Sequence, residues 1–191
     1  MKKYLPLLFV VTLSLAACQS YEPYPRPYAY PRIDLPKATT YQTFQTQSCP
    51  FTFAYPSTAK ISRDNDDSCW VDINFPEYDL TWHITYRDTR ETNKDKATYF
   101  EDYRRLVYKH TQKARDIQAR PISYPAGSGT WFDLYGNVGT PSQIFMHDST
   151  EQQIVMMSFY FQTALKNDSL QPVIEYMKGE VDKMLGTFAW E

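Results

Sequence analysis

The stretch from Leu170 to Phe188 reads LQPVIEYMKGEVDKMLGTF, and its apolar residues recur every three or four positions. That spacing predicts one long helix with a continuous apolar stripe. The stripe consists of Leu170, Val173, Ile174, Met177, Val181, Met184, Leu185 and Phe188. Asp168 or Ser169 is expected to cap the helix, with Pro172 in its first turn, where a missing N–H costs little. We expect the stripe to pack across a β-sheet, with Trp190 closing its edge.

Shorter stretches upstream alternate apolar and polar residues, which is typical of strands that bury one face. In the stretch 70–75, Val71 and Ile73 share one face, while Asp72 and Asn74 share the other. The predicted strands are 51–55, 70–75, 80–87, 117–124, 131–135, 142–147 and 153–162, with a turn at Gly127-Ser-Gly129.

A second helix is predicted over 93–115, with Asn93 as its N-cap. Its buried stripe is expected to hold Phe100, Tyr103, Leu106, Val107, His110 and Ala114. The predicted fold class is therefore α+β: an antiparallel sheet flanked by one mid-chain helix and one long C-terminal helix, an α/β/α sandwich. The order of elements and the opening Phe51-Thr-Phe-Ala-Tyr-Pro56 resemble the PsbP/Mog1 sandwich, a likeness that implies a fold and no function.

The chain begins like a secretory signal. Lys2 and Lys3 precede an apolar run, and Leu15-Ala-Ala-Cys18 follows it. This last stretch resembles the bacterial lipobox, in which the cysteine is lipidated on sulfur and becomes the new N-terminus. We therefore expect a signal peptide at 1–17 and lipidation of Cys18, with no other cofactor.

The residues after Cys18 divide into a tether and a domain. The stretch 18–48 opens with a run of prolines and tyrosines, and proline favours an extended chain, so this lipidated N-terminus should act as a spacer or a docking strip. The remainder, 49–191, is expected to form a single globular α+β domain with an aromatic core. It contains no apolar stretch long enough for a transmembrane helix. We expect a cell-envelope protein that is lipid-anchored and faces the periplasm.

Two cysteines remain beyond the anchor, Cys49 and Cys69, in a compartment that permits disulfides. If their strands formed a simple antiparallel hairpin, Cys49 would lie opposite the far end of the second strand, beyond disulfide reach. The sequence therefore leaves two alternatives for Cys49 and Cys69: a disulfide between them or two buried thiols.

The residues that could carry chemistry do not form a recognisable site. The three histidines, His83, His110 and His147, lack metal-ligand spacing, so no metal and no catalytic residue are predicted. In His147-Asp148-Ser149 neighbouring strand residues point to opposite faces, which excludes a relay between them. The acidic run 64–67 lacks the glycine and the glutamate of a calcium loop. The net charge of −2 gives no basic field for nucleic acid.

Several motifs, taken together and in order, resemble the gliding motility lipoprotein GldD family of Bacteroidota. They are Arg32-Ile-Asp-Leu-Pro36, Cys49-Pro-Phe-Thr-Phe53, Cys69-Trp-Val-Asp-Ile-Asn-Phe-Pro76, Tyr108-Lys-His-Thr-Gln-Lys-Ala114, Asp148-Ser149, Asn167-Asp-Ser-Leu170 and Thr187-Phe-Ala-Trp190. Pro31 and His147 depart mildly from the family's pattern. The resemblance implies an envelope lipoprotein needed for gliding and for type IX secretion, associated with other Gld lipoproteins or with the membrane protein GldE. It brings no catalytic residue.

Three functions follow as hypotheses, in order of preference. The first is a non-enzymatic assembly or scaffold component at a membrane, with no small-molecule ligand expected. The second is a periplasmic ligand-binding module on the same fold, and the third is a lipoprotein hydrolase. The sequence names neither the contact surface nor the membrane, outer or cytoplasmic, that holds the anchor.

Overall fold

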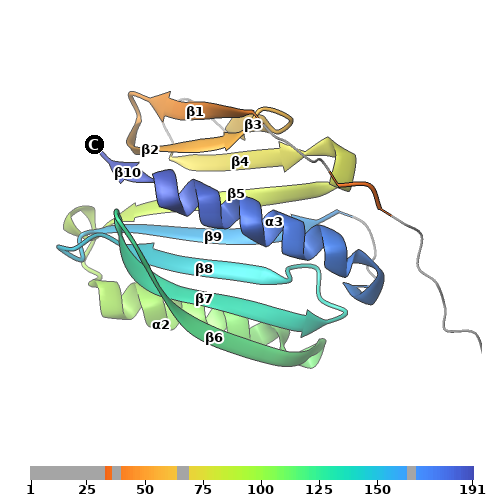
Figure 1. The fold of residues 1–191 in the computed structure, drawn as a ribbon. Coiled ribbons are helices and arrows are strands. Elements are labelled where there is room, and N and C mark those ends of the chain that lie inside the picture. Colours follow the sequence, from red (N-terminus) through yellow and green to blue (C-terminus); the bar gives the residue numbers. More distant parts are fainter. Residues whose placement is uncertain (1–32, 36–39, 64–68, 163–166) are drawn as a thin grey trace, which may run out of the picture. The chain divides into compact units, whose positions relative to one another are not determined.

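The computed structural model describes residues 33–35, 40–63, 69–162 and 167–191, all within the compact unit Arg32–Glu191. A seven-stranded antiparallel sheet forms its centre (Figure 1). In spatial order its strands are β3 (Lys60–Arg63), β4 (Trp70–Phe75), β5 (Leu80–Asp88), β9 (Gln153–Phe161), β8 (Ser142–His147), β7 (Gly127–Gly136) and β6 (Ala114–Tyr124). Short 3₁₀ turns are η1 (Pro76–Tyr78), η2 (Thr89–Glu91) and η3 (Lys109–Gln112).

A smaller, three-stranded sheet packs beside the first. Its order is β1 (Tyr41–Thr46), β2 (Cys49–Pro56) and β10 (Ala189–Trp190). β1 belongs to the fold because it pairs antiparallel with β2 and buries Phe44 against Phe53, with ring centroids 4.9 Å apart. The folded part therefore extends N-terminal of Cys49, where we expected it to begin.

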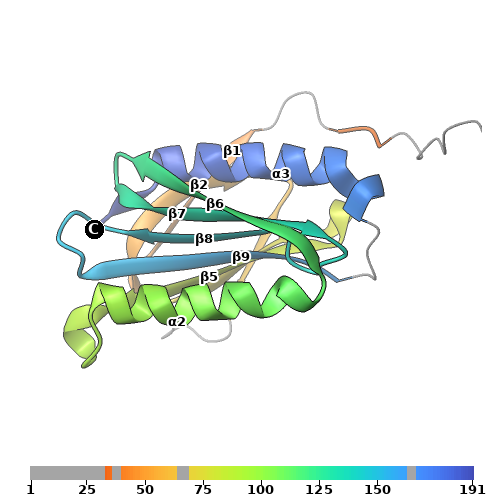
Figure 2. The ribbon, with the colours of Figure 1, turned by 90° about the horizontal axis from the view of Figure 1, so that it is seen from below.

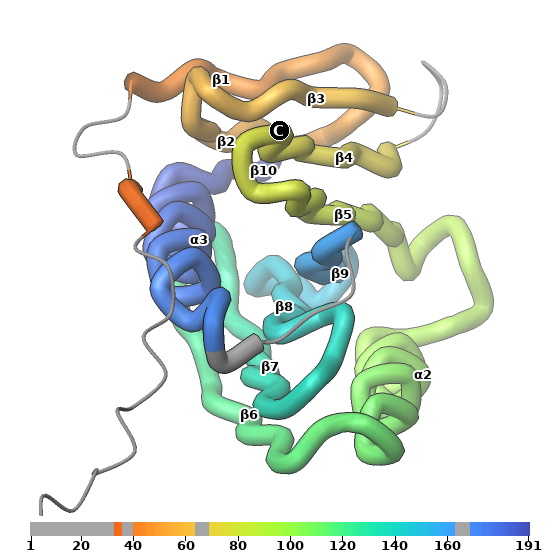
Figure 3. The backbone as a smooth tube through the Cα atoms, turned by 90° about the vertical axis from the view of Figure 1, so that its right-hand side faces the viewer, coloured from red at the N-terminus to blue at the C-terminus, as the bar shows by residue number. Residues whose placement is uncertain are grey.

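Two helices, α2 (Lys96–Tyr108) and α3 (Asn167–Thr187), lie on opposite faces of the seven-stranded sheet (Figures 2 and 3). The α+β class with a mid-chain and a C-terminal helix is thus as predicted. The α3 side carries the larger core, in which Val173, Ile174 and Met177 are buried. The α2 side carries a smaller cluster around Tyr103, Phe132 and Phe145.

The boundaries of both helices differ from the prediction. α3 begins at Asn167, before the expected caps, so Pro172 lies inside the helix instead of in its first turn. α2 begins at Lys96 because the Asp95 carboxylate accepts from the Thr98 N–H at 2.8 Å, so Asp95 and not Asn93 is the N-cap.

The buried stripe of α2 also differs from the predicted one. It runs through Tyr99, Tyr103 and Val107, while Leu106 is 53% exposed. His110 lies in η3 and Ala114 in β6, each half-buried, because the helix ends at Tyr108.

The glycines expected to form a turn begin strand β7 instead. A Cβ at Gly127 would lie 1.9 Å from the carbonyl oxygen of His147, and one at Gly129 would lie 1.9 Å from that of Phe145. These positions require glycine because β7 approaches β8 too closely for any side chain. The actual turn lies just before, between Tyr124 and Gly127.

Cys49 and Cys69 are joined by a disulfide, with their Cα atoms 5.2 Å apart. The hairpin geometry that argued against this bond does not occur, because β4 pairs with β3 and β5, whereas β2 pairs with β1 and β10. The disulfide therefore links the smaller sheet to the larger one.

Candidate functional site

The face of the seven-stranded sheet that carries α2 is only partly covered. α2 contacts β8, and Figure 3 shows it beside β8 and away from β4. The inner residues of β4 and β5 are buried in the α3-side core, as Val71, Ile73 and Trp82 illustrate. The alternate residues face the other way and, apart from the buried Thr81, stay partly exposed, with Trp70 at 47% and Tyr160 at 39% exposure. We call this surface of β4, β5 and β9 the open face.

The strand register arranges nine side chains of the open face in three rows. Residues directly opposite one another in a sheet lie on the same face. The rows are Trp70–Thr85–Met156, Asp72–His83–Ser158 and Asn74–Thr81–Tyr160. One ring from each row lies on a diagonal across the three strands, which we call the aromatic diagonal: Trp70 on β4, His83 on β5 and Tyr160 on β9.

Contacts with neighbouring side chains hold the rings of the aromatic diagonal in place. Nδ1 of His83 lies 2.7 Å from Oδ1 of Asp72, and its ring meets that of Tyr160 edge-on, with centroids 5.2 Å apart. The guanidinium of Arg87 lies 5.5 Å from the Trp70 ring centroid. Burial raises the pKa of Tyr160, so its hydroxyl stays protonated at neutral pH.

A hollow of about 240 Å³ opens on the face, lined by Trp70, Asp72, His83, Ile84 and Thr85. Next to it, the hydroxyl of Thr81 donates to Asn74 at 2.9 Å, and the Asn74 amide donates to Ser62 at 2.9 Å. The hollow therefore combines aromatic walls with polar side chains whose orientation is fixed by neighbours.

The middle row, Asp72–His83–Ser158, contains the residue types of an acyl-transfer triad. A triad requires the histidine to be hydrogen-bonded to the nucleophile. Across the described strands no hydrogen bond joins His83 to Ser158, and Tyr103 of α2 approaches Ser158 instead. The row therefore has the residue types of a catalytic triad but lacks the hydrogen bond between its histidine and its serine.

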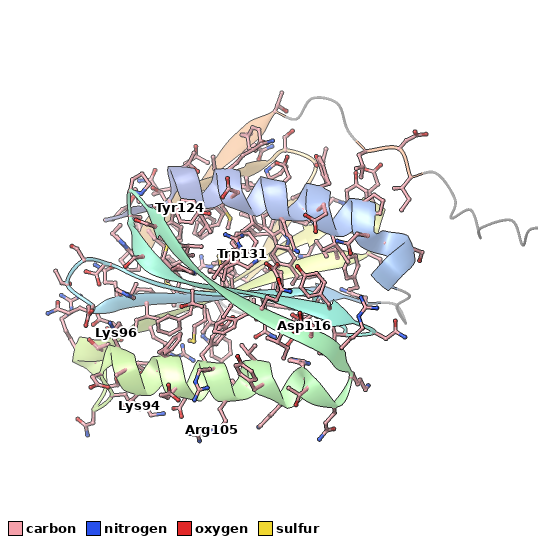
Figure 4. The ribbon with its side chains drawn as sticks, turned by 60° about the horizontal axis from the view of Figure 1, so that its bottom comes forward. Lys94, Lys96, Arg105, Asp116, Tyr124 and Trp131 are labelled. Carbon is pink, nitrogen blue, oxygen red and sulfur yellow. A yellow bond between two sulfur atoms is a disulfide. The ribbon has the colours of Figure 1, made fainter. Side chains whose placement is uncertain are left out.

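A second hollow, of about 490 Å³, lies between α2 and strands β6 to β8. Phe100, Phe145 and Ile122 supply its apolar walls, while Lys96 and His147 supply its polar groups. Figure 4 shows Lys96 in the N-terminal half of α2, where its ammonium pairs with Glu151 at 2.6 Å. We call this hollow the α2 groove.

The remaining predicted residues are not gathered into one site. His147 bonds the backbone oxygen of Asp148 at 2.8 Å, and the Asp148 carboxylate accepts from the backbone N–H groups of Gln152 and Gln153, so it holds the β8–β9 turn. Burial lowers the pKa of His110. Cys18 and the acidic run 64–67 lie outside the described residues. Within the described ranges no three His, Cys, Asp or Glu side chains cluster as metal ligands.

The sequence predicts the β4 part of the open face but not the part that β9 contributes. The alternation of Trp70, Asp72 and Asn74 is visible in the sequence, but the pairing of β5 with β9, which adds Ser158 and Tyr160, joins segments about 70 residues apart. The local alternation along either strand does not indicate which strands pair with each other.

Comparison with known proteins adds a family and two distant folds. The family model for "Gliding motility lipoprotein GldD" matches residues 20–190. No curated protein sequence matches the chain. The solution structure of cyanobacterial PsbP (CyanoP) from Synechocystis sp. PCC 6803 is similar at a TM-score of 0.47 and 10% identity, over 81% of this chain and 94% of that one. A crystal structure from Bacteroides thetaiotaomicron VPI-5482 is similar at 0.36 and 12%, over 78% of this chain and 48% of that one.

Among the described elements, no helix combines the length and hydropathy that a membrane crossing requires.

Proposed function

The chain belongs to the gliding motility lipoprotein GldD family, and we propose that it is a membrane-anchored, non-enzymatic assembly component of the gliding motility and type IX secretion machinery. The observation that carries this proposal is the extent of the family match. It begins at residue 20, two positions after Cys18, and ends at Trp190.

The anchor proposed for this role is a lipid on Cys18. A diacylated cysteine buries two acyl chains, and two chains suffice for stable membrane attachment. The domain would then face the periplasm, confined beside membrane proteins at a high effective concentration. The partners we propose are other envelope proteins of the gliding apparatus, among them other Gld lipoproteins or the membrane protein GldE.

The non-enzymatic part of the proposal is supported by the geometry of the open face. The one row with catalytic residue types has its Ser158 beside Tyr103, and among the described residues no hydrogen bond joins that serine to His83. Asp148, in the other such motif, is engaged by backbone N–H groups of its own turn.

The α2 groove favours a second candidate function, a periplasmic ligand-binding module. Its apolar walls and few polar groups are typical of small-molecule sites. Filling the groove with Ala97→Trp would block a ligand but leave membrane attachment unchanged. A loss of function in a stably folded Ala97→Trp variant would favour this candidate over the assembly role.

The test of the assembly role is crosslinking in intact cells. Cells that produce tagged wild-type protein are crosslinked, and the captured proteins are identified against cells that produce an unrelated lipoprotein with the same signal and tag. We expect a reproducible set of envelope proteins that includes gliding components. Capture of the same proteins by the unrelated lipoprotein would contradict the proposal.

A further inference from the structure

The open face has the chemistry of a saccharide site, and we propose that it binds an uncharged, extended oligosaccharide of linked hexose or N-acetylhexosamine units along the aromatic diagonal Trp70–His83–Tyr160. This inference goes beyond the proposed assembly role and does not depend on it.

The first argument is the spacing of the rings. Trp70 and Tyr160 are two strands apart and four residues apart along the strand direction. With strands about 4.8 Å apart and about 3.4 Å per residue, the two ring positions are separated by roughly 17 Å. His83 lies on the strand between them, and its ring contacts that of Tyr160 edge-on with centroids 5.2 Å apart. The diagonal thus has Trp70 at one end and the His83–Tyr160 pair at the other, a separation that matches an extended chain of several sugar rings, each with an apolar face that can stack on an aromatic side chain.

The second argument is the polar chemistry between the rings. Sugar hydroxyl groups both donate and accept hydrogen bonds, so their sites present carboxylates, amides, hydroxyls and imidazoles. Asp72, Asn74 and Thr85 supply the first three beside the diagonal. His83 uses Nδ1 on Asp72, which leaves Nε2 and the second Asp72 oxygen without a partner among the described residues. Both residues line the 240 Å³ hollow, where one sugar ring would enter beside Trp70.

The third argument is charge. Asp72 is the one carboxylate among the nine side chains of the three rows, and the guanidinium of Arg87 lies over Trp70 at the edge of the same face. The charged groups of the open face are therefore of opposite sign, which favours a neutral, hydroxyl-rich ligand over an anionic or cationic one.

The fourth argument is that the side chains of the face are held in position before a ligand binds. Thr81, Asn74 and Ser62 form a chain of hydrogen bonds at one end of the face, and Arg87 lies over Trp70 at the other. Side chains that are held in place before binding lose less conformational entropy when a ligand arrives. The surface is thus preorganised, as a low-molecular-weight ligand requires.

The test uses the full mature chain, purified in detergent with its lipid, and two probes, chitotetraose and cellotetraose. Binding is followed by isothermal titration calorimetry and by the intrinsic tryptophan fluorescence, which a sugar over Trp70 would change. We expect at least one tetrasaccharide to bind, its monosaccharide to bind much more weakly, and Trp70→Ala and Tyr160→Ala each to weaken binding about tenfold.

Tyr108→Ala is the matched control, because Tyr108 is 41% exposed, close to the 39% of Tyr160, but lies on α2. It should bind like the wild type. A conservative variant, Trp70→Phe, keeps an aromatic ring in case Trp70→Ala fails to fold, and it should retain more affinity than Trp70→Leu. Failure of both tetrasaccharides to bind the wild type would overturn the proposal, as would equal binding by Trp70→Phe, Trp70→Leu and Tyr160→Ala. Loss of a crosslinked protein from Trp70→Ala without any saccharide binding would assign the face to protein docking instead and would also overturn it.

Discussion

The ammonium of Lys178 lies 2.8 Å from the carboxylate of Asp133, joining helix α3 to strand β7 where both side chains are largely buried. Trp131, which Figure 4 shows in the sheet beneath α3, donates its indole N–H to the same carboxylate at 3.2 Å. Burial alone would lower the pKa of Lys178, but the hydrogen bond and charge of Asp133 raise it overall. The long C-terminal helix is therefore fixed to the sheet by an ion pair as well as by its apolar stripe.

Removing the charge of Asp133 should destabilise the fold. Asp133→Asn leaves Lys178 buried without its main partner, and breaking a buried pair costs on the order of 3 kcal/mol. The matched control is Glu175→Gln, since Glu175 also contacts Lys178, at 3.2 Å, but is 57% exposed. Exposed pairs contribute less than about 1 kcal/mol. Urea unfolding of the three proteins measures both values, and equal losses for the two variants would contradict this account.

Two glycine substitutions should change stability in opposite directions. Gly129→Ala would place a Cβ 1.9 Å from a backbone oxygen of β8, so the sheet must shift, at a cost of roughly 2 kcal/mol or more. Gly179→Ala lies inside α3, where a Cβ meets nothing within 4 Å, and should stabilise the protein by about 1 kcal/mol through helix propensity. Thermal unfolding monitored by circular dichroism checks both signs. A Gly129→Ala variant as stable as the wild type would show that β7 does not approach β8 as described.

The β8–β9 turn should be sensitive to acid. Burial raises the pKa of Asp148, but hydrogen bonds from Thr150 and from the N–H groups of Gln152 and Gln153 outweigh it and hold the pKa below its usual value of 3.8. A carboxyl whose pKa is lowered in the folded state contributes stability above its unfolded pKa and loses it as the pH falls. The difference in unfolding free energy between wild type and Asp148→Asn should therefore be largest near neutral pH and shrink between about pH 5 and pH 2.

Asp116→Asn, at an exposed position on β6, is the control for this pH series. Its stability difference from the wild type should be small at every pH. A difference for Asp148→Asn that does not vary with pH would mean that the carboxylate charge contributes nothing to the turn.

The Cys49–Cys69 disulfide should be present in the exported protein. Intact-mass measurement should find two hydrogens fewer than the thiol form, and a bulky thiol reagent should label neither cysteine without prior reduction. Closing a 20-residue separation contributes about 3 kcal/mol in the chain-entropy model, so a Cys49→Ser/Cys69→Ser double variant should unfold at lower urea concentration. Rapid labelling of either cysteine in native, unreduced protein would disprove the bond.

Local patterns in the sequence predicted most elements but not how they meet. The stripe on α3 and the alternation in β4 are properties of neighbouring residues, and both were predicted correctly, except that Leu170 is only half-buried and Phe188 lies just beyond the end of the helix. The short strands β3 and β10 could not be predicted, because β3 has four residues and β10 has two, which is too few to show an alternating pattern. The exposure of Leu106 and the starting residues of α2 and α3 depend on tertiary packing and capping. The open face could not be predicted, since it depends on the register between β5 and β9.

The proposed function rests on attachment through Cys18, so the most direct measurement is colony spreading on agar by a deletion strain that carries either of two forms of the protein. One is the wild type, and the other is Cys18→Ser behind an ordinary signal peptide, which should be exported as a folded, soluble protein. Without two acyl chains the domain loses its confinement beside membrane partners. We predict that the wild type restores spreading and that the soluble form, produced at the same level, restores little or none. Full spreading with the soluble form would contradict the account of a membrane-anchored assembly component.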